Sequence, residues 1–411
     1  MVENQWLIAA VWMGLAFLAS IISIRLAISV ALVEIIVGML GGNFLHHYML
    51  GPGQLPEWIT FLAGFGSVLL TFLAGAEIEP DTMKRYWREA LSIGFVGFLF
   101  PFLGAMAFAY YGAHWSPNAS KIAGIAMSTT SVAVVYAVMV ETGLNRAPIG
   151  KLILAACFVC DLGTVLALGV LFASYNIWML LLLIVATGVL LATPRVARWV
   201  FGRFGNSVSE PDVKFLFLLL FFLGGLAAQA NSEAVLTAYL LGLVVASVLA
   251  EHKETVRHMR STVFTMLTPF YFLKAGMYVS LHALWLSLGV ITLLFLVKMV
   301  TKIVGIYPLT YLFKIFDRRL ANYTTAMMST GLTFGTISAL YGLNHHYIDQ
   351  QQYTVLVTVV IGSAIIPTMI AQRFFKPDVN IPTEIDKLPT PLPGTNRGVT
   401  SIPASRPIES D

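Results

Sequence analysis

Apolar residues form long, continuous runs along this chain, and short polar segments separate them. A helix of about 20 residues rises about 30 Å, which matches the hydrocarbon core of a bilayer. Apolar and polar residues do not alternate within the runs, which excludes a membrane β-barrel. The pattern therefore predicts an all-α polytopic membrane protein with about thirteen transmembrane helices. The runs are approximately 6–24, 28–47, 57–78, 90–112, 120–140, 150–173, 176–194, 213–229, 233–250, 262–280, 283–312, 321–342 and 352–372.

The composition also indicates a membrane protein, and it argues against a disulfide framework and against an ATPase. Hydrophobic residues make up 57% of the 411 residues and charged residues 11%, whereas a soluble chain carries about 25% charged residues. The two cysteines, Cys157 and Cys160, lie one helical turn apart inside one run, so a disulfide framework is not expected. No Gly-rich nucleotide motif follows a strand, so no ATPase is predicted. We expect no enzyme activity, no cofactor and no nucleic-acid partner.

Basic residues indicate how the runs are oriented. Most of the 25 Lys and Arg residues fall in alternate connections or after the last run, and Lys121 alone lies in the opposite set. By the positive-inside rule, the N-terminus is predicted outside and the C-terminus in the cytoplasm. Residues 377–411 are rich in Pro, Thr and Ser and lack an apolar period, which predicts a disordered cytoplasmic tail after a membrane domain of residues 1–376.

A few ionisable residues fall deep inside the runs. Asp161 lies about 12 residues, or about 18 Å, from the start of its run, near the bilayer midplane. Such a carboxylate is costly if left ionised and alone, so it is a functional candidate. Lys302 and Lys274 share its depth, and an Asp–Lys pairing would compensate the charges. Snorkelling to the interface is the alternative, and it fits Lys298 better than the other two lysines.

Two runs carry hydroxyl clusters at mid-depth, at residues 128–131 and 329–333. Hydroxyl groups satisfy backbone groups where a membrane helix opens. Tight packing of small residues, with hydroxyls bonded to their own helix, is the alternative for either cluster alone. The two clusters are seven runs apart, which favours inverted repeats of about 1–173 and 213–372, joined by a linker helix at 176–194. Midplane sites between such repeats are typical of transporters.

Other polar residues give weaker signals. Glu34 lies in the second run, where pairing within the bundle is expected, and Glu77 ends the third run as a funnel-mouth or packing residue. His345 and His346 lie at the predicted outer edge. Nothing near them has metal-ligand spacing, so no metal centre is expected beyond a monovalent cation at Asp161.

Several short segments together resemble the bacterial monovalent cation:proton antiporters of the Kef-like branch, which includes sodium/proton exchangers. The order and spacing of these segments carry the resemblance, which covers about residues 10 to 372. The segments are Leu73-Ala74-Gly75-Ala76-Glu77, Thr130-Ser131-Val132-Ala133-Val134, residues 150–156 leading to Asp161, residues 270–277, and Lys302-Ile303-Val304-Gly305.

The resemblance implies a sodium/proton antiporter fold, in which a dimerisation domain and a core domain with crossed, broken helices move as an elevator. It implies a homodimer in the bacterial inner membrane. Asp161 would bind either the cation or protons, never both at once. The implied roles, by group, are cation or proton binding for Asp161, Thr130, Ser131 and Cys160, supporting charge for Lys302, Lys274, Glu77 and Glu34, and helix interruption for Thr129, Thr330, Gly331 and Thr333.

The chain departs from the family pattern at three places. Cys160 stands where electrogenic members have a first Asp, which favours electroneutral exchange, although Lys302 then lacks its usual partner. Lys274 occupies a position that is more often uncharged. Residues 330–332 read Thr-Gly-Leu where many relatives have Arg-Gly-Glu. The predicted function is exchange of Na⁺, or Li⁺, for H⁺. The alternatives are a Kef-type K⁺/H⁺ antiporter, a passive cation channel, for which no filter loop is visible, and an organic-solute transporter.

Overall fold

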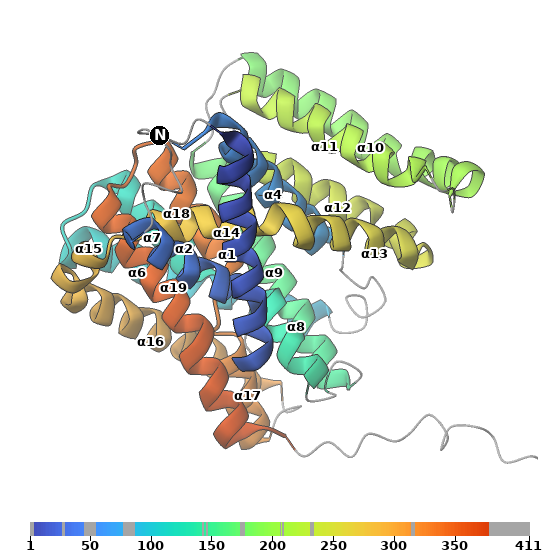
Figure 1. Cartoon of the computed structure of the whole chain (residues 1–411). Helices are drawn as coiled ribbons and strands as arrows, with labels where there is room; N and C mark the ends of the chain where they lie inside the picture. Colours follow the sequence, from blue (N-terminus) through green and yellow to red (C-terminus); the bar gives the residue numbers. More distant parts are fainter. Residues whose placement is uncertain are drawn as a thin grey trace, which may run out of the picture. The chain divides into compact units, whose positions relative to one another are not determined.

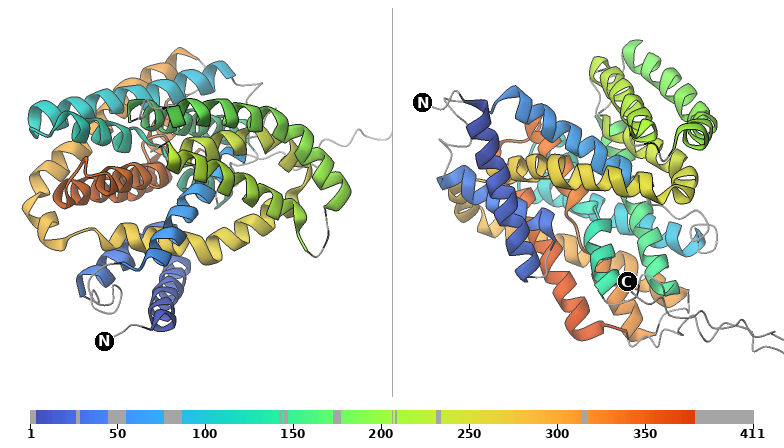
Figure 2. Two further views of the ribbon diagram at one scale, coloured as in Figure 1. Left: turned by 90° about the horizontal axis from the view of Figure 1, so that it is seen from above. Right: turned by 45° about the vertical axis from the view of Figure 1, so that its right-hand side comes forward.

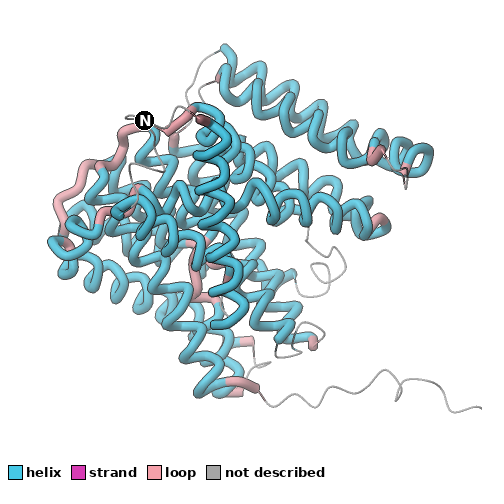
Figure 3. Tube along the Cα trace, in the orientation of Figure 1, coloured by secondary structure: helices cyan, strands magenta, loops and turns pink. Residues whose placement is uncertain are grey.

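The computed structural model describes most of the membrane domain. The described residues are 4–26, 29–44, 55–76, 87–141, 144, 147–172, 177–205, 207, 209–230, 234–313 and 317–377. Every regular element among them is a helix (Figure 3). The predicted tail lies outside the described residues, apart from Pro377.

The helices follow the apolar runs closely (Figure 1). They are α1 (Gln5–Leu26), α2 (Val30–Phe44), α4 (Glu57–Ala76), α6 (Trp87–Ala107), η1 (Phe108–Gly112), α7 (Pro117–Ser128), α8 (Val132–Glu141), α9 (Pro148–Leu171), α10 (Ile177–Phe204), α11 (Pro211–Gln229), α12 (Ala234–Glu251), α13 (Lys253–Thr262), η3 (Val263–Leu267), α14 (Thr268–Met277), α15 (Leu281–Leu286), α16 (Leu288–Leu312), α17 (Arg318–Met327), α18 (Thr333–Asn344), α19 (Gln350–Ile370) and η4 (Ala371–Phe375).

Among the described residues, nine helices are long and apolar enough to cross a membrane. The four other runs are interrupted or short. Residues 28–47 contain the 15-residue helix α2, and the runs at 120–140, 262–280 and 321–342 are each divided between shorter helices. The all-α membrane fold is confirmed, while the thirteen crossings and the inverted repeats stay predictions.

Two helix boundaries differ from those predicted. Helix α10 continues to Phe204, ten residues beyond the expected end of the linker helix, so Arg195 and Arg198 lie inside a helix rather than in a loop. Arginine has a high helix propensity and its long side chain reaches polar surroundings from a helix end, so a charge does not end the hydrogen-bond ladder. The run 283–312 is divided at Ser287, which lies between α15 and α16; Ser280 accepts from the Ala283 amide and caps the start of α15.

One group of helices is held together by close backbone approaches. Helix α14 packs along α2 and α4, and α4 packs along α12, as both views of Figure 2 show for the yellow α14 and the blue α2 and α4. A Cβ atom at Gly276 would collide with the Ile35 carbonyl, and one at Gly242 with the Phe72 carbonyl. Because small residues let membrane helices approach closely, these contacts create a tightly packed group.

A second group surrounds the divided runs at 120–140 and 321–342. Helix α6 packs against α7, α9 and α16, and α18 packs against α7 and α19. Side-chain caps fix where these helices begin. Ser116 accepts from the Ala119 amide directly before Pro117, Asp317 accepts from the Leu320 amide, and Asp349 forms a capping box with Gln352. The caps set the register in which the interruptions fall within this group.

Candidate functional site

The run at 120–140 opens at its hydroxyl cluster. Helix α7 ends at Ser128, Thr129 is extended, and α8 starts at Val132. The Thr129 hydroxyl donates to the Ala126 carbonyl at 3.1 Å, and the Ser131 hydroxyl accepts from the Val134 amide at 3.4 Å. Hydroxyl groups therefore form hydrogen bonds with backbone groups at the end of the first half-helix and at the start of the second.

The run at 321–342 opens in the same way. Helix α17 ends at Met327, and α18 starts at the half-buried Thr333. The Thr330 hydroxyl donates to the Met327 carbonyl at 2.9 Å. The predicted interruption residues Thr330, Gly331 and Thr333 therefore lie in or directly after the gap.

The two gaps are joined to each other. The Ser131 amide donates to the Thr330 carbonyl at 3.1 Å, and the Thr130 hydroxyl donates to the Met328 carbonyl at 2.9 Å. We call these two gaps, residues 129–131 and 328–332, the crossing. The C-terminal ends of α7 and α17 and the N-terminal ends of α8 and α18 all reach it, so partial charges of both signs meet in one place.

Lys302 of α16 is fully buried against the first gap. Its ammonium donates to the Ser128 carbonyl and the Thr130 hydroxyl, both at 2.9 Å, and lies 3.8 Å from the Cys160 sulfur. The cation therefore lies at the C-terminal end of α7, where the helix dipole is negative. Three partners occupy the three donors of this ammonium group.

Asp161 of α9 directly follows Cys160, which contacts the crossing. The Cys160 thiol donates to the Ser128 carbonyl at 3.2 Å, and its sulfur lies 3.3 Å from the Thr130 hydroxyl oxygen. Asp161 is 1% exposed, and its Oδ1 atom has no hydrogen-bond partner. In the part of the chain that the structure describes, no direct ion pair joins Asp161 to Lys302, so charge compensation between them stays a prediction. The acceptors of Lys302 are instead the Ser128 carbonyl at the end of α7 and the Thr130 hydroxyl in the gap. The sequence alone does not identify these acceptors.

Lys298 lies one helical turn before Lys302 and reaches the second gap. It is fully buried, and its ammonium donates to the Ser363 hydroxyl at 2.9 Å. That hydroxyl also lies 3.4 Å from the Gly331 carbonyl oxygen. Snorkelling therefore does not apply to Lys298. The sequence contains one signal that Lys298 faces the same site as Lys302. The two lysines are four residues apart, which places them on one face of a helix.

Tyr239 of α12 is a second residue that sequence reasoning missed. It is fully buried, and its hydroxyl donates to the Phe158 carbonyl of α9 at 3.0 Å, one turn before Asp161. This bond joins the first helix group to the helix that carries the candidate carboxylate. A tyrosine in an apolar run gives no sequence signal for such a contact.

Two of the predicted supporting residues, Glu34 and Lys274, lie away from the crossing. Glu34 is 1% exposed on α2, which packs mainly against α1 and α14, and its Oε2 atom has no hydrogen-bond partner. Lys274 is buried on α14 beside a separate cavity. Glu77 lies outside the described residues.

A family profile described as sodium/hydrogen exchanger, transmembrane, matches residues 13–376. The chain is 27% identical to the "Putative Na(+)/H(+) antiporter YjbQ" of Bacillus subtilis, over 88% of this chain and 62% of that protein. It is 25% identical to the "Na(+)/H(+) antiporter" of Enterococcus hirae, over 84% of this chain and 90% of that protein. The chain thus spans less than two thirds of the length of the first of these relatives.

Solved structures show the same fold. The sodium proton antiporter MjNhaP1 from Methanocaldococcus jannaschii matches with a TM-score of 0.67 at 16% identity, covering 91% of this chain and 100% of that one. Its structure at pH 8 matches with a TM-score of 0.61 at 14% identity, covering 89% and 96%.

Proposed function

The chain belongs to the sodium/hydrogen exchanger family, and we propose that it exchanges Na⁺ for H⁺ across a membrane by competition at Asp161. The family membership confirms the resemblance expected from the sequence motifs. The family is one of transporters, which agrees with the expectation of no enzyme activity. The names of the relatives support Na⁺ and do not favour the Kef-type K⁺/H⁺ alternative. Transport of Li⁺ is part of the proposal.

The partnerless Oδ1 atom of Asp161 carries the proposal. A buried carboxylate oxygen without a hydrogen bond is costly, and the cost falls when the oxygen gains a proton or a cation. One carboxylate cannot hold both at once. Binding of either ion therefore excludes the other, and the two gradients become coupled without another energy source.

Electroneutral exchange follows from the way the nearby charges are used. Lys302 holds the end of α7 through the Ser128 carbonyl, so we propose that it keeps its charge throughout the cycle. Asp161 is then the single group whose occupancy changes. It carries one Na⁺ in one direction and one H⁺ in the other, which moves no net charge.

Thr130, Ser131 and Cys160 would form the polar wall of this site. The Thr130 hydroxyl already bonds to Lys302 and to the Met328 carbonyl, so its contribution is to fix the geometry. Cys160 contacts the same hydroxyl and the Ser128 carbonyl. These contacts hold the residue before Asp161 in place, which positions the carboxylate.

The two helix groups support an elevator movement. The crossing is built from the second group, while α2, α4, α12 and α14 pack closely among themselves. We propose that the second group slides against the first and carries Asp161 between the two sides. The homodimer, the inner-membrane location and the outside N-terminus belong to this proposal and rest on the resemblance and on the distribution of basic residues.

Reconstituted vesicles test the proposal. Asp161→Asn should abolish Na⁺-driven proton movement in proteoliposomes. Asp212→Asn is the matched control, because Asp212 is also a buried aspartate but bonds to Thr255, away from the crossing. Full exchange by a folded Asp161→Asn protein would remove the proposal.

The pH dependence of the same assay tests competition. Because protons occupy Asp161 at low pH, the apparent KM for Na⁺ should rise as pH falls, while the maximal rate at saturating Na⁺ is retained. A KM that does not change with pH would contradict binding of both ions at one group.

A further inference from the structure

A cavity of about 150 Å³ lies between the two helix groups, apart from the crossing. Helices α4, α12 and α14 of the first group line it together with α9 and α18 of the second. Its polar lining comes from Thr60 and Ser67 of α4, Lys274 and Tyr271 of α14, and Tyr341 and Asn344 of α18. Thr60 and Asn344 are exposed, so the cavity extends to the surface near the start of α4 and the end of α18.

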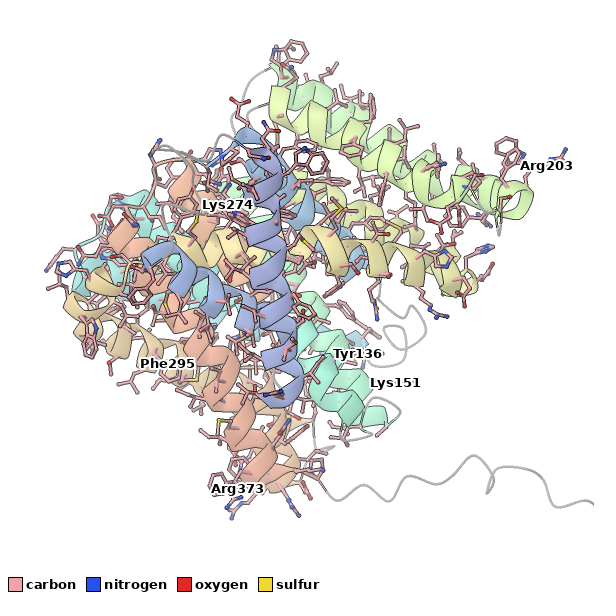
Figure 4. The ribbon with its side chains drawn as sticks, viewed as in Figure 1. Tyr136, Lys151, Arg203, Lys274, Phe295 and Arg373 are labelled. Atoms are coloured by element: carbon pink, nitrogen blue, oxygen red, sulfur yellow. The ribbon has the colours of Figure 1, made fainter. Side chains whose placement is uncertain are left out.

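Lys274 is the one charged residue among the described residues that line this cavity. It is 4% exposed, and among the residues that the structure describes, no hydrogen bond or ion pair to its ammonium is found. Figure 4 shows it within the bundle, whereas Arg203 and Arg373 lie at helix ends. The other two buried lysines, Lys298 and Lys302, both have direct partners. A buried ammonium without a counter-charge is strongly unfavourable.

The lining favours one class of ligand. Among the described residues, no carboxylate lines the cavity, and Lys274, Thr60 and Asn344 offer N–H and O–H donors. The cavity has room for several water molecules, so a small ion fits in it together with a few waters. We propose that this cavity binds a small monovalent anion of the chloride type on Lys274.

The position of the cavity gives this anion a role in exchange, and this step rests on the proposed function. Leu168, which lines the cavity, lies about two turns after Asp161 on α9. A bare ammonium there would repel a cation approaching along the boundary between the helix groups. A bound anion neutralises Lys274 and removes this repulsion. Exchange should therefore be several-fold slower when gluconate, a much larger anion, replaces chloride.

Binding is tested first, independently of transport. Purified protein is heated in sodium chloride, sodium bromide or sodium gluconate at equal ionic strength. A ligand of the native state raises the unfolding midpoint by mass action, so chloride and bromide should raise it relative to gluconate. The shift should be lost in Lys274→Met and kept in Lys274→Arg. Lys121→Met is the matched control, because Lys121 lies on α7 outside the cavity.

The outcomes separate this proposal from the proposed function. Asp161→Asn should keep the chloride shift while losing exchange. Equal chloride shifts in the wild type and Lys274→Met would overturn the anion site, as would a wild type that shows no difference between chloride and gluconate. A Lys274-dependent shift in a protein that exchanges no Na⁺ would leave the anion site standing and remove the proposed function.

Discussion

The two gaps of the crossing are each held by a lysine of the same helix, but in different ways. At the first gap, the Lys302 ammonium bonds directly to the Ser128 carbonyl at the end of α7. At the second, the Lys298 ammonium bonds to the Ser363 hydroxyl of α19, which lies 2.9 Å from the Val360 carbonyl oxygen and 3.4 Å from the Gly331 carbonyl oxygen. Direct contact compensates a helix dipole, whereas the indirect contact fixes the position of a neighbouring helix. We infer that the first lysine supports the ion site and the second supports the scaffold.

The largest effect should come from removing the direct contact. Lys302→Met leaves the Ser128 carbonyl and the Thr130 hydroxyl without their charged donor, which we expect to destabilise the protein by about 2–3 kcal/mol. Because Thr130 also contacts Cys160 beside Asp161, the exchange rate should fall at least about tenfold, as a change of about 1.4 kcal/mol is one decade. Thermal unfolding and proteoliposome exchange measure the two effects.

Lys302→Arg serves as the control for charge, because it keeps the cation but changes the donor geometry. It should recover stability more than exchange. If Lys302→Met exchanged at the wild-type rate, the first gap would be a scaffold contact like the second, and the comparison would fail.

The second effect, somewhat smaller, should come from Lys298→Met. The substitution removes the donor to Ser363, and the loss of a hydrogen bond from a charged group should cost about 1.5–3 kcal/mol of stability. Because the Lys298 ammonium bonds to Ser363 and, among the described residues, forms no hydrogen bond with Cys160 or Thr130, the apparent KM for Na⁺ should stay within about twofold in vesicles that contain folded protein. A KM that rises as strongly as in Lys302→Met would show that both lysines serve the ion site.

Sequence predicted the broad arrangement because it depends on local patterns. The apolar runs set the helices, and the hydroxyl clusters at 128–131 and 329–333 coincide with the gaps. From the sequence, snorkelling fits Lys298 better than it fits Lys302 or Lys274. The depth of a lysine along its helix does not show which groups its side chain contacts. Its partner Ser363 is 65 positions away in the chain. Similarly, the acceptors of Lys302 are created by the end of α7, so its pairing depends on tertiary structure rather than on residue type.

Gly331 offers a third, more limited test of the second gap. A Cβ atom at this position would collide with the Lys298 ammonium and lie 2.9 Å from the Thr129 hydroxyl oxygen. Gly331→Ala should destabilise the protein by about 1–3 kcal/mol, the usual range for overpacking. Because the lysine chain is the nearer obstacle, the double variant with Lys298→Met should lose less stability than the sum of the single losses. Additive losses would place the strain at Thr129 instead.

The smallest effect should come from the hydroxyl that links Lys298 to the second gap. Ser363→Ala removes the acceptor of Lys298 but leaves the lysine in place, so the stability loss should be about 1 kcal/mol, typical of one hydrogen bond. The comparison variant is Thr130→Val, which removes the corresponding hydroxyl at the first gap together with its bond to the Met328 carbonyl. Thr130→Val should reduce exchange, whereas Ser363→Ala should leave the rate nearly unchanged. Equal losses of exchange would mean that α16 supports the two gaps in the same way, because a purely structural hydroxyl would then be as important for transport as the one beside Cys160.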